Sequence, residues 1–214
     1  MAILSLATIF SRLPIASVEW DIRRNDQLAG LGSGDVMQTE LADPVWSAAV
    51  TLGRGLHDEL KQAAALIRRL HGAKQPFFMC DPTSLYPQAD PKGVTLGAAA
   101  VTVRAVSADR SILQLQGLPA GYVLTLGDKV QIPYAGGRHA FHEVSETAAA
   151  TAGGQLDVQV FPFLPFSLAV GLAVTLKQPA CPVIIDPATH RPGTARRSVT
   201  EGAGFTVIQK KSAS

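Results

Sequence analysis

Turn signals recur about every ten residues through the middle of this 214-residue chain, between Val94 and Ile184. Glycine, proline and aspartate cluster at these points, where they favour tight turns. The apolar segments between the turns are short, and no helix-length periodic segment separates them, which excludes parallel strands joined by crossover helices. The spacing predicts a small antiparallel barrel or sandwich. Its strands are expected at about 99–106, 111–117, 122–124, 128–133, 139–145, 155–161 and 173–177.

One segment has the period of a helix. Apolar residues recur at three- and four-residue steps from Leu56 to Leu70. An acidic pair beginning at Asp58 and basic residues near the end complement the helix dipole. Gly72 suits the left-handed conformation that often ends a helix. The pattern predicts a helix over residues 56–71.

Apolar segments predict four further strands in the first 80 residues. A flexible glycine-rich turn over residues 30–34 is expected after the first of them. The tripeptide Ala42-Asp43-Pro44 is expected to separate the second from the third, because proline lacks the N–H group that a central strand donates. The four strands are expected at 17–24, 36–41, 45–52 and 76–80.

The two ends of the chain are predicted to share a domain. A proline-rich passage over residues 86–93 predicts an exit from the first domain. A last strand, 204–209, follows a loop-like stretch and needs a partner, so the economical arrangement returns it to the first domain. The sequence therefore predicts a mainly β protein in which residues 1–90 and 187–214 form one domain and residues 91–186 form an inserted β-barrel domain.

Charged residues make up only 17 % of the chain, against about 25 % in an average globular protein. With 47 % hydrophobic residues, the chain either has a dense β core or buries part of its surface against other subunits, and both alternatives stay open. The longest fully apolar stretches are far shorter than the roughly 20 residues that span a bilayer, so no membrane insertion is expected. The N-terminal sequence MAILSLATIF lacks the basic residues of a signal peptide, which predicts synthesis and folding in a cytoplasm.

Positive charge is concentrated at the C-terminal end. Residues 187–214 hold five basic residues against one acidic residue, a net charge of +4, while the rest of the chain has a net charge of −2. A basic end can bind nucleic acid. Five charges without interleaved aromatic residues favour an ordinary solvated or interfacial segment instead.

The sequence predicts no catalytic, cofactor-binding or metal site, since motifs of hydrolases, metalloproteases and nucleotide-binding proteins do not occur. The best polar cluster is His139, His142 and Glu143. Residues three apart on a strand point to opposite faces, so the two histidines are not expected to hold a metal ion together. Cys80 and Cys181 lie outside zinc-binding spacings and are expected to be reduced, partly buried thiols.

Several segments, taken in order, resemble proteins of long phage tails. The helix end is followed by an aromatic strand and Asp-Pro, and a later glycine-aspartate turn leads into a strand. The segments are 66–72, 75–82, 117–121, 126–132, 138–144 and 153–164. Over about residues 45–208, their order resembles the distal tail protein (Dit) family and related tail-tip hub proteins of siphophages and gene transfer agents.

The resemblance implies a tail-tube-like β-sandwich, called the belt, with one flanking helix and an inserted OB-like β-barrel. It implies a structural virion protein at the tail tip rather than an enzyme, with no cofactor. Six belts would form a ring between the tail tube protein and the tail-tip hub or baseplate proteins, and the barrel would offer a platform for fibres. The ring would be assembled in the host bacterial cytoplasm, and DNA would only pass through its lumen. The expected interface residues are Phe205, Val207, Arg196 and Arg197.

Other classes of protein stay open. The chain could be another tail-tip or completion protein at a different ring position. A barrel that binds carbohydrate or nucleic acid would use exposed aromatic side chains such as Tyr122, Tyr134 and Phe141, although core or turn positions suit these residues better. A cell-wall hydrolase would need a catalytic pair that the sequence does not offer.

Overall fold

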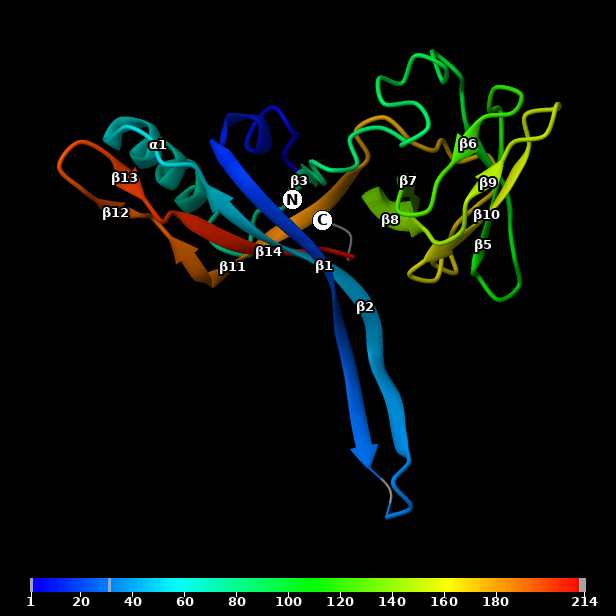
Figure 1. The fold of residues 1–214 in the computed structure, drawn as a ribbon, viewed down its shortest axis with the longest axis horizontal. Coiled ribbons are helices and arrows are strands. Elements are labelled where there is room, and N and C mark those ends of the chain that lie inside the picture. Colours follow the sequence, from blue (N-terminus) through cyan, green and yellow to red (C-terminus); the bar gives the residue numbers. More distant parts are fainter. Residues whose placement is uncertain (1, 31, 212–214) are drawn as a thin grey trace.

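The computed structural model describes residues 2–30 and 32–211. Within these residues the chain is mainly β with one α-helix, which confirms the expected class (Figure 1). The strands form two five-stranded sheets and two smaller pairs. No helix in the described part of the chain is long and apolar enough to cross a membrane.

The first sheet has the strand order β1-β2-β14-β11-β3, and every neighbouring pair is antiparallel. β14 is the last strand of the chain and lies at the centre of the sheet. It therefore joins β2 from the N-terminal part to β11 from the C-terminal part. The bounds are β1 Ile15–Gly30, β2 Val36–Leu52, β3 Phe77–Cys80, β11 Ala180–Arg191 and β14 Gly204–Gln209.

The predicted helix is present as α1, His57–Arg68, and hydrogen-bonded turns continue the segment to His71. At its start the Leu56 N–H donates to Glu59 Oε2 at 3.2 Å, which satisfies one of the N–H groups that a helix N-terminus leaves unpaired. At its end Gly72 has a φ of +68°, and a Cβ there would lie 2.8 Å from the Pro187 side chain. Conformation and packing both require glycine at this position.

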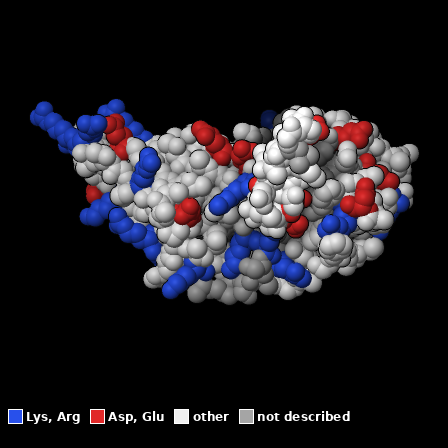
Figure 2. Space-filling view, turned by 90° about the horizontal axis from the view of Figure 1, so that it is seen from below, with Lys and Arg blue, Asp and Glu red and all other residues white. Residues whose placement is uncertain are grey.

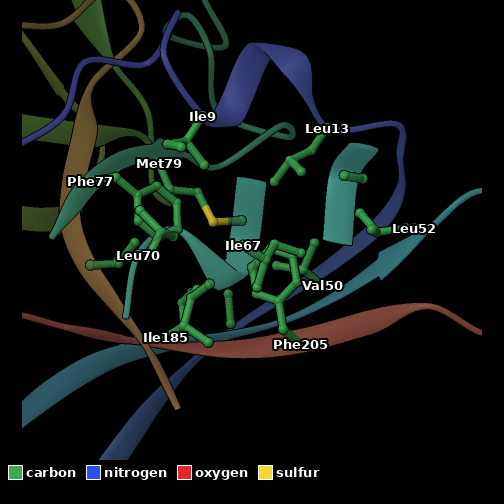
Figure 3. Close-up of a cluster of buried hydrophobic side chains, with 14 of the residues drawn as sticks. Ile9, Leu13, Val50, Leu52, Ile67, Leu70, Phe77, Met79, Ile185 and Phe205 are labelled. Carbon is green, nitrogen blue, oxygen red and sulfur yellow. The ribbon is translucent and has the colours of Figure 1, made fainter. Parts of the chain in front are cut away.

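Because side chains alternate along its strands, the first sheet has one apolar face, which is buried in the core. Val50 on β2 and Phe205 and Val207 on β14 are at most 4 % exposed on this face. Leu60 and Ile67 of α1 pack against them, and a short 3-10 helix, η1 (Phe10–Arg12), lies next to the same cluster (Figure 3). Burial of one helix stripe and one sheet face together is the main stabilising term for this half of the molecule.

β2 runs without interruption, so the predicted break at Ala42-Asp43-Pro44 is wrong. The register between β1 and β2 shifts at this point, between the pairs Arg23–Val45 and Asn25–Ala42. The shift is a β-bulge, and it leaves Pro44 outside the ladder, where its missing N–H breaks no hydrogen bond.

The second sheet has the order β4-β5-β10-β8-β7 and its own buried core. The segment expected as a strand at 173–177 forms only isolated bridges, but it bonds both edge strands. Leu172 accepts from the Val103 N–H at 2.9 Å, and Thr175 exchanges two hydrogen bonds with Gln131. This segment closes the sheet into a barrel-like unit. The bounds are β4 Thr102–Val106, β5 Ile112–Gln116, β7 Lys129–Tyr134, β8 Arg138–Val144 and β10 Leu156–Phe161.

The remaining elements are small. β6 (Val123–Leu124) pairs with β9 (Ala148–Ala149) beside the second sheet, and β12 (Thr194–Ala195) pairs with β13 (Thr200–Glu201) beside the first. The short helical turn η2 (Ala135–Gly137) joins β7 to β8. The part of the chain between β3 and β11, which contains the second sheet, is called the inserted domain below.

β11 was not predicted from the sequence. It contains Pro182 and Pro187, and proline is uncommon inside a strand. Pro182 pairs with Phe78 of β3, and its carbonyl accepts from the Lys210 N–H at 2.8 Å. The domain boundary expected between residues 186 and 187 falls inside this strand. The chain returns to the first sheet at residue 180, where β11 begins. The expected first domain also includes residues 1 and 212–214, which lie outside the described residues.

An aromatic cluster joins the two sheets. Trp46 donates its Nε1–H to the Phe141 carbonyl at 3.0 Å, and the rings of Trp20 and Trp46 lie 5.8 and 5.7 Å from that of Phe141. A second buried hydrogen bond runs from the Ala180 N–H to Gln131 Oε1 at 2.8 Å. Buried aromatic contacts and satisfied polar groups of this kind hold the inserted domain against the first sheet.

Neighbouring side chains of β14 point to opposite faces of the sheet, so replacing them with alanine should change the free energy of unfolding by different amounts. Phe205→Ala leaves a cavity in the core and should lower the free energy of unfolding by about 3–5 kcal/mol. Thr206→Ala, on the other face, should change it by less than about 1 kcal/mol. Urea denaturation followed by tryptophan fluorescence measures both values, and equal costs would contradict the burial of Phe205.

Candidate assembly surfaces

The distal half of the β1–β2 hairpin projects from the first sheet as an arm, residues 25–43 (Figure 1). Leu31, in its predicted glycine-rich turn, lies outside the described residues. β14 pairs with β2 only from Ser47 to Thr51, so it does not support the arm. A two-stranded ribbon is marginally stable alone, and exposed apolar side chains on it indicate a contact surface. The side chains in question are Leu28, Val36, Met37 and Leu41, at 67, 68, 58 and 61 % exposure.

These apolar side chains lie on both faces of the arm. The hairpin register pairs Gly30 with Val36, and alternation along β1 places Leu28 on that same face. Met37 lies on the opposite face by the same alternation, and Leu41 lies at a bulge in the ladder, between the pairs Asp26–Glu40 and Asn25–Ala42. The arm therefore presents two apolar faces, unlike the body of the sheet, which buries one face in the core.

The arm is also acidic. Between residues 25 and 42 the sequence holds three acidic residues and no Lys or Arg. Asp26 accepts from the Gln38 side chain and from Arg24. Asp35 and Glu40 are exposed and form no ion pair within the described residues. Negative charge thus accompanies the apolar side chains at the end of the arm.

The face of the first sheet opposite the core, called the open face below, carries small, charged and apolar side chains. Cross-strand rows on it, read from β1 through β2 to β14, are Asp21–Ser47–Ile208 and Glu19–Ala49–Thr206. Both rows continue on β11, where Ile184 pairs with Ile208 and Asp186 pairs with Thr206. Three carboxylates and an apolar pair therefore share this face, and alternation along β1 adds Arg23 to it.

β1 ends the first sheet, and its only strand partner among the described residues is β2. Its outer edge therefore presents unpaired N–H and C=O groups, to which another strand can add. A cleft of about 790 Å³ lies beside β1 and is lined on its other side by the inserted domain. Lys129 and Glu143 form an ion pair within that lining.

The four predicted interface residues do not lie together. Phe205 and Val207 point into the core of their own chain, while Thr206 between them lies on the open face. Arg196 and Arg197 are exposed beside β12–β13, at the end of the sheet away from the inserted domain (Figure 1). Arg196 Nε lies 2.8 Å from Glu201 Oε1, which partly neutralises its charge.

Basic side chains are gathered elsewhere as well. Seen from the side to which the arm points, most Lys and Arg side chains lie along one long edge of the molecule, with most Asp and Glu side chains away from that edge (Figure 2). The charge asymmetry expected from the sequence is thus only partly a property of the C-terminal segment.

A pocket of about 230 Å³ lies between the base of the arm and the inserted domain, and it is called the underside pocket below. Both histidines of the predicted polar cluster line it but bind different partners. His139 Nδ1 lies 3.1 Å from Gln131 Nε2, and the His142 Nδ1–H donates to the Pro162 carbonyl at 2.9 Å. Within the described residues, no three His, Cys, Asp or Glu side chains are grouped to hold a metal ion.

The two thiols are buried and unbridged, as expected. They lie on adjacent strands, where Cys80 pairs with Ala180 and Cys181 with Met79. Burial raises the pKa of Cys80 to about 12. A thiol that stays protonated is a poor nucleophile, so neither the exposure nor the charge state suits catalysis.

The aromatic side chains considered for ligand stacking do not form a platform. Tyr122 and Phe141 are 3 % and 1 % exposed, and the Tyr122 hydroxyl lies 3.5 Å from Asp90 Oδ2. Tyr134 is covered by the Arg138 guanidinium, 4.9 Å from its ring centroid. These positions are the core and turn positions that the sequence favoured for them.

No protein-family model matches the sequence, and no curated protein matches it at significant similarity.

Burial of His142 predicts acid sensitivity of the fold. Burial lowers the pKa of His142 from 6.5 to about 4. The unfolded chain therefore binds more protons than the folded chain between pH 6.5 and 4, and acidification through this window lowers the free energy of unfolding. The shift corresponds to about 3 kcal/mol.

The His142→Asn variant tests this prediction, because its amide can still donate to the Pro162 carbonyl. We expect it to lose about 3 kcal/mol less stability than the parent chain when the pH falls from 7 to 4. Urea denaturation at the two pH values measures the difference. Identical pH dependence of the two chains would contradict the role of His142.

Proposed function

We propose that this chain is a structural virion protein that forms a closed ring at the distal end of a phage tail and joins the tail tube to the tail-tip hub or baseplate. The observation that carries the proposal is the arm, whose two apolar faces and acidic end have no partner within the described part of the chain. Such a surface is stabilised by contact with another molecule.

Ring formation satisfies several surfaces at once. A repeated head-to-tail contact closes when the rotation between subunits completes a circle, and every subunit then uses the same two surfaces. The outer edge of β1 is available for pairing with a neighbouring strand, which removes the hazard of an open sheet edge. Arm and edge belong to the same hairpin, so one neighbour can engage both.

The domain arrangement supports the same proposal. In this proposal the first sheet with α1 is the belt that the resemblance to distal tail proteins implies, and the barrel-like unit between β3 and β11 is the insertion. Six belts in the ring and an OB-like insertion that carries fibres follow from that resemblance. The inserted domain would lie at the periphery, held by the aromatic cluster around Trp46.

The open face suits the lumen of such a ring. Glu19, Asp21 and Asp186 place negative charge along it. DNA phosphates are repelled by carboxylates rather than bound by them. A wall of this kind lets DNA pass without holding it.

Removing apolar contacts from the arm should prevent assembly without unfolding the chain. In the Leu28→Ser, Met37→Ser double variant each face of the arm loses one exposed apolar side chain. We expect the parent chain to form a ring, alone or with tail tube protein, and the variant to remain monomeric, because the lost contacts lie between subunits. Size-exclusion chromatography with light scattering measures both masses.

The matched control is Val94→Ser with Leu126→Ser, which removes two equally exposed apolar side chains outside the arm. It should assemble like the parent chain. A parent chain that stays monomeric with tail tube protein present, and that is absent from purified virions, would overturn the proposed function.

A further inference from the structure

The underside pocket combines basic and aromatic side chains around a small cavity. Arg138 and Lys211 line it from the inserted domain and from the end of the first sheet, and Phe163 forms part of its wall at 57 % exposure. Lys211 Nζ lies 3.6 Å from Asp43 Oδ2, an exposed contact that is easily exchanged. The pocket therefore keeps positive charge available to an acidic occupant.

The aromatic wall continues outside the pocket. Phe166 is 89 % exposed and Val170 is 69 % exposed on the same loop as Phe163. The Arg110 guanidinium lies 3.7 Å from the Phe166 ring centroid and 5.9 Å from that of Phe163. Arg110 adds a third basic group and the loop adds further apolar area beside the pocket, a combination that suits a partner that is both acidic and apolar.

The ring of His142, which lines the pocket, has an unused hydrogen-bond acceptor. Because its Nδ1–H donates to the Pro162 carbonyl at 2.9 Å, Nε2 carries the lone pair. This buried nitrogen has no partner in the described structure. Its surface is almost wholly covered by the protein, so it is an unpaired polar atom in the pocket wall and not a contact point for an occupant.

The arm has the chemistry that the pocket requires. Asp35 provides an exposed carboxylate, and its neighbour Val36 provides exposed apolar area. The tip of an arm cannot reach its own pocket, because Asp43 at the pocket and Asp35 at the tip are eight residues apart along a strand, about 26 Å. The occupant is therefore the arm of a second copy.

We propose that the tip of each arm docks in the underside pocket of the next copy, with Asp35 against Arg138 and Lys211. The inference rests on the proposed ring and names its contact. The contact is head-to-tail, since it joins two different surfaces, and it can repeat around a closed ring.

A charge swap tests the contact. The arm variant carries Asp35→Lys, and the pocket variant carries Arg138→Glu and Lys211→Glu. Each variant alone brings like charges together and should self-associate at least about a hundredfold more weakly than the parent chain. An equal mixture pairs every basic arm with an acidic pocket and every acidic arm with a basic pocket, so it should restore the ring. Light scattering of each variant and of the mixture, on full chains shown to be folded by circular dichroism, gives the masses.

Glu146→Lys and Lys92→Glu change exposed charges outside both surfaces and are the matched controls. If the arm and pocket variants each assemble like the parent chain, the inference is overturned while the proposed ring stands. If both variants fail and their mixture stays monomeric, arm and pocket do not contact each other, and the inference is overturned as well. A parent chain that never assembles overturns the ring and the contact together.

Discussion

The insertion of β14 between β2 and β11 is the constraint on which the rest of the structure depends. The last strand of the chain supplies the centre of the first sheet, and without it β1 and β2 would share no ladder with β11 and β3. Its buried residues, Phe205 and Val207, also complete the core beneath α1. Formation of this sheet therefore requires nearly the whole chain, which makes the first sheet a long-range, cooperative unit.

Trp46 connects the first sheet to the inserted domain. Trp46 lies on β2 just after the bulge at the base of the arm, and its indole N–H is bound to the inserted domain at Phe141. The Trp46 N–H is bound to Gln209 Oε1 at 3.1 Å, at the end of β14. One residue thus fixes the base of the arm, the end of the central strand and the inserted domain relative to one another. Surfaces contributed by these three parts can act together because they are rigidly placed.

Local patterns predicted the elements that depend on local sequence. The periodicity from Leu56 to Leu70 and the turns of the inserted domain located α1 and most strands of the second sheet. The sequence did not reveal β11, because prolines at 182 and 187 are tolerated only through the pairing that the tertiary structure provides. The sequence predicted that Pro44 interrupts the strand. The β-bulge that accommodates this proline depends on the partner strand as well, so it could not be predicted from the local sequence. The same limit applies to the candidate surfaces. The arm is exposed because the pairing of β14 with β2 ends at Ser47, and the local sequence of the hairpin does not predict where this pairing ends.

Low charge content left two explanations open, and the structure separates them. Both sheets have dense cores, which account for most of the apolar residues. Of the eleven large apolar side chains exposed in the described residues, seven lie in two segments, the arm and the loop from Phe163 to Val170. The first segment is acidic and the second lies beside Arg110 and Arg138. A two-fold symmetric contact between arms would bring acidic residues together at a cost, whereas a contact between unlike surfaces brings opposite charges together. For the proposed ring, charge therefore favours a head-to-tail contact, which is the kind of contact that a ring requires.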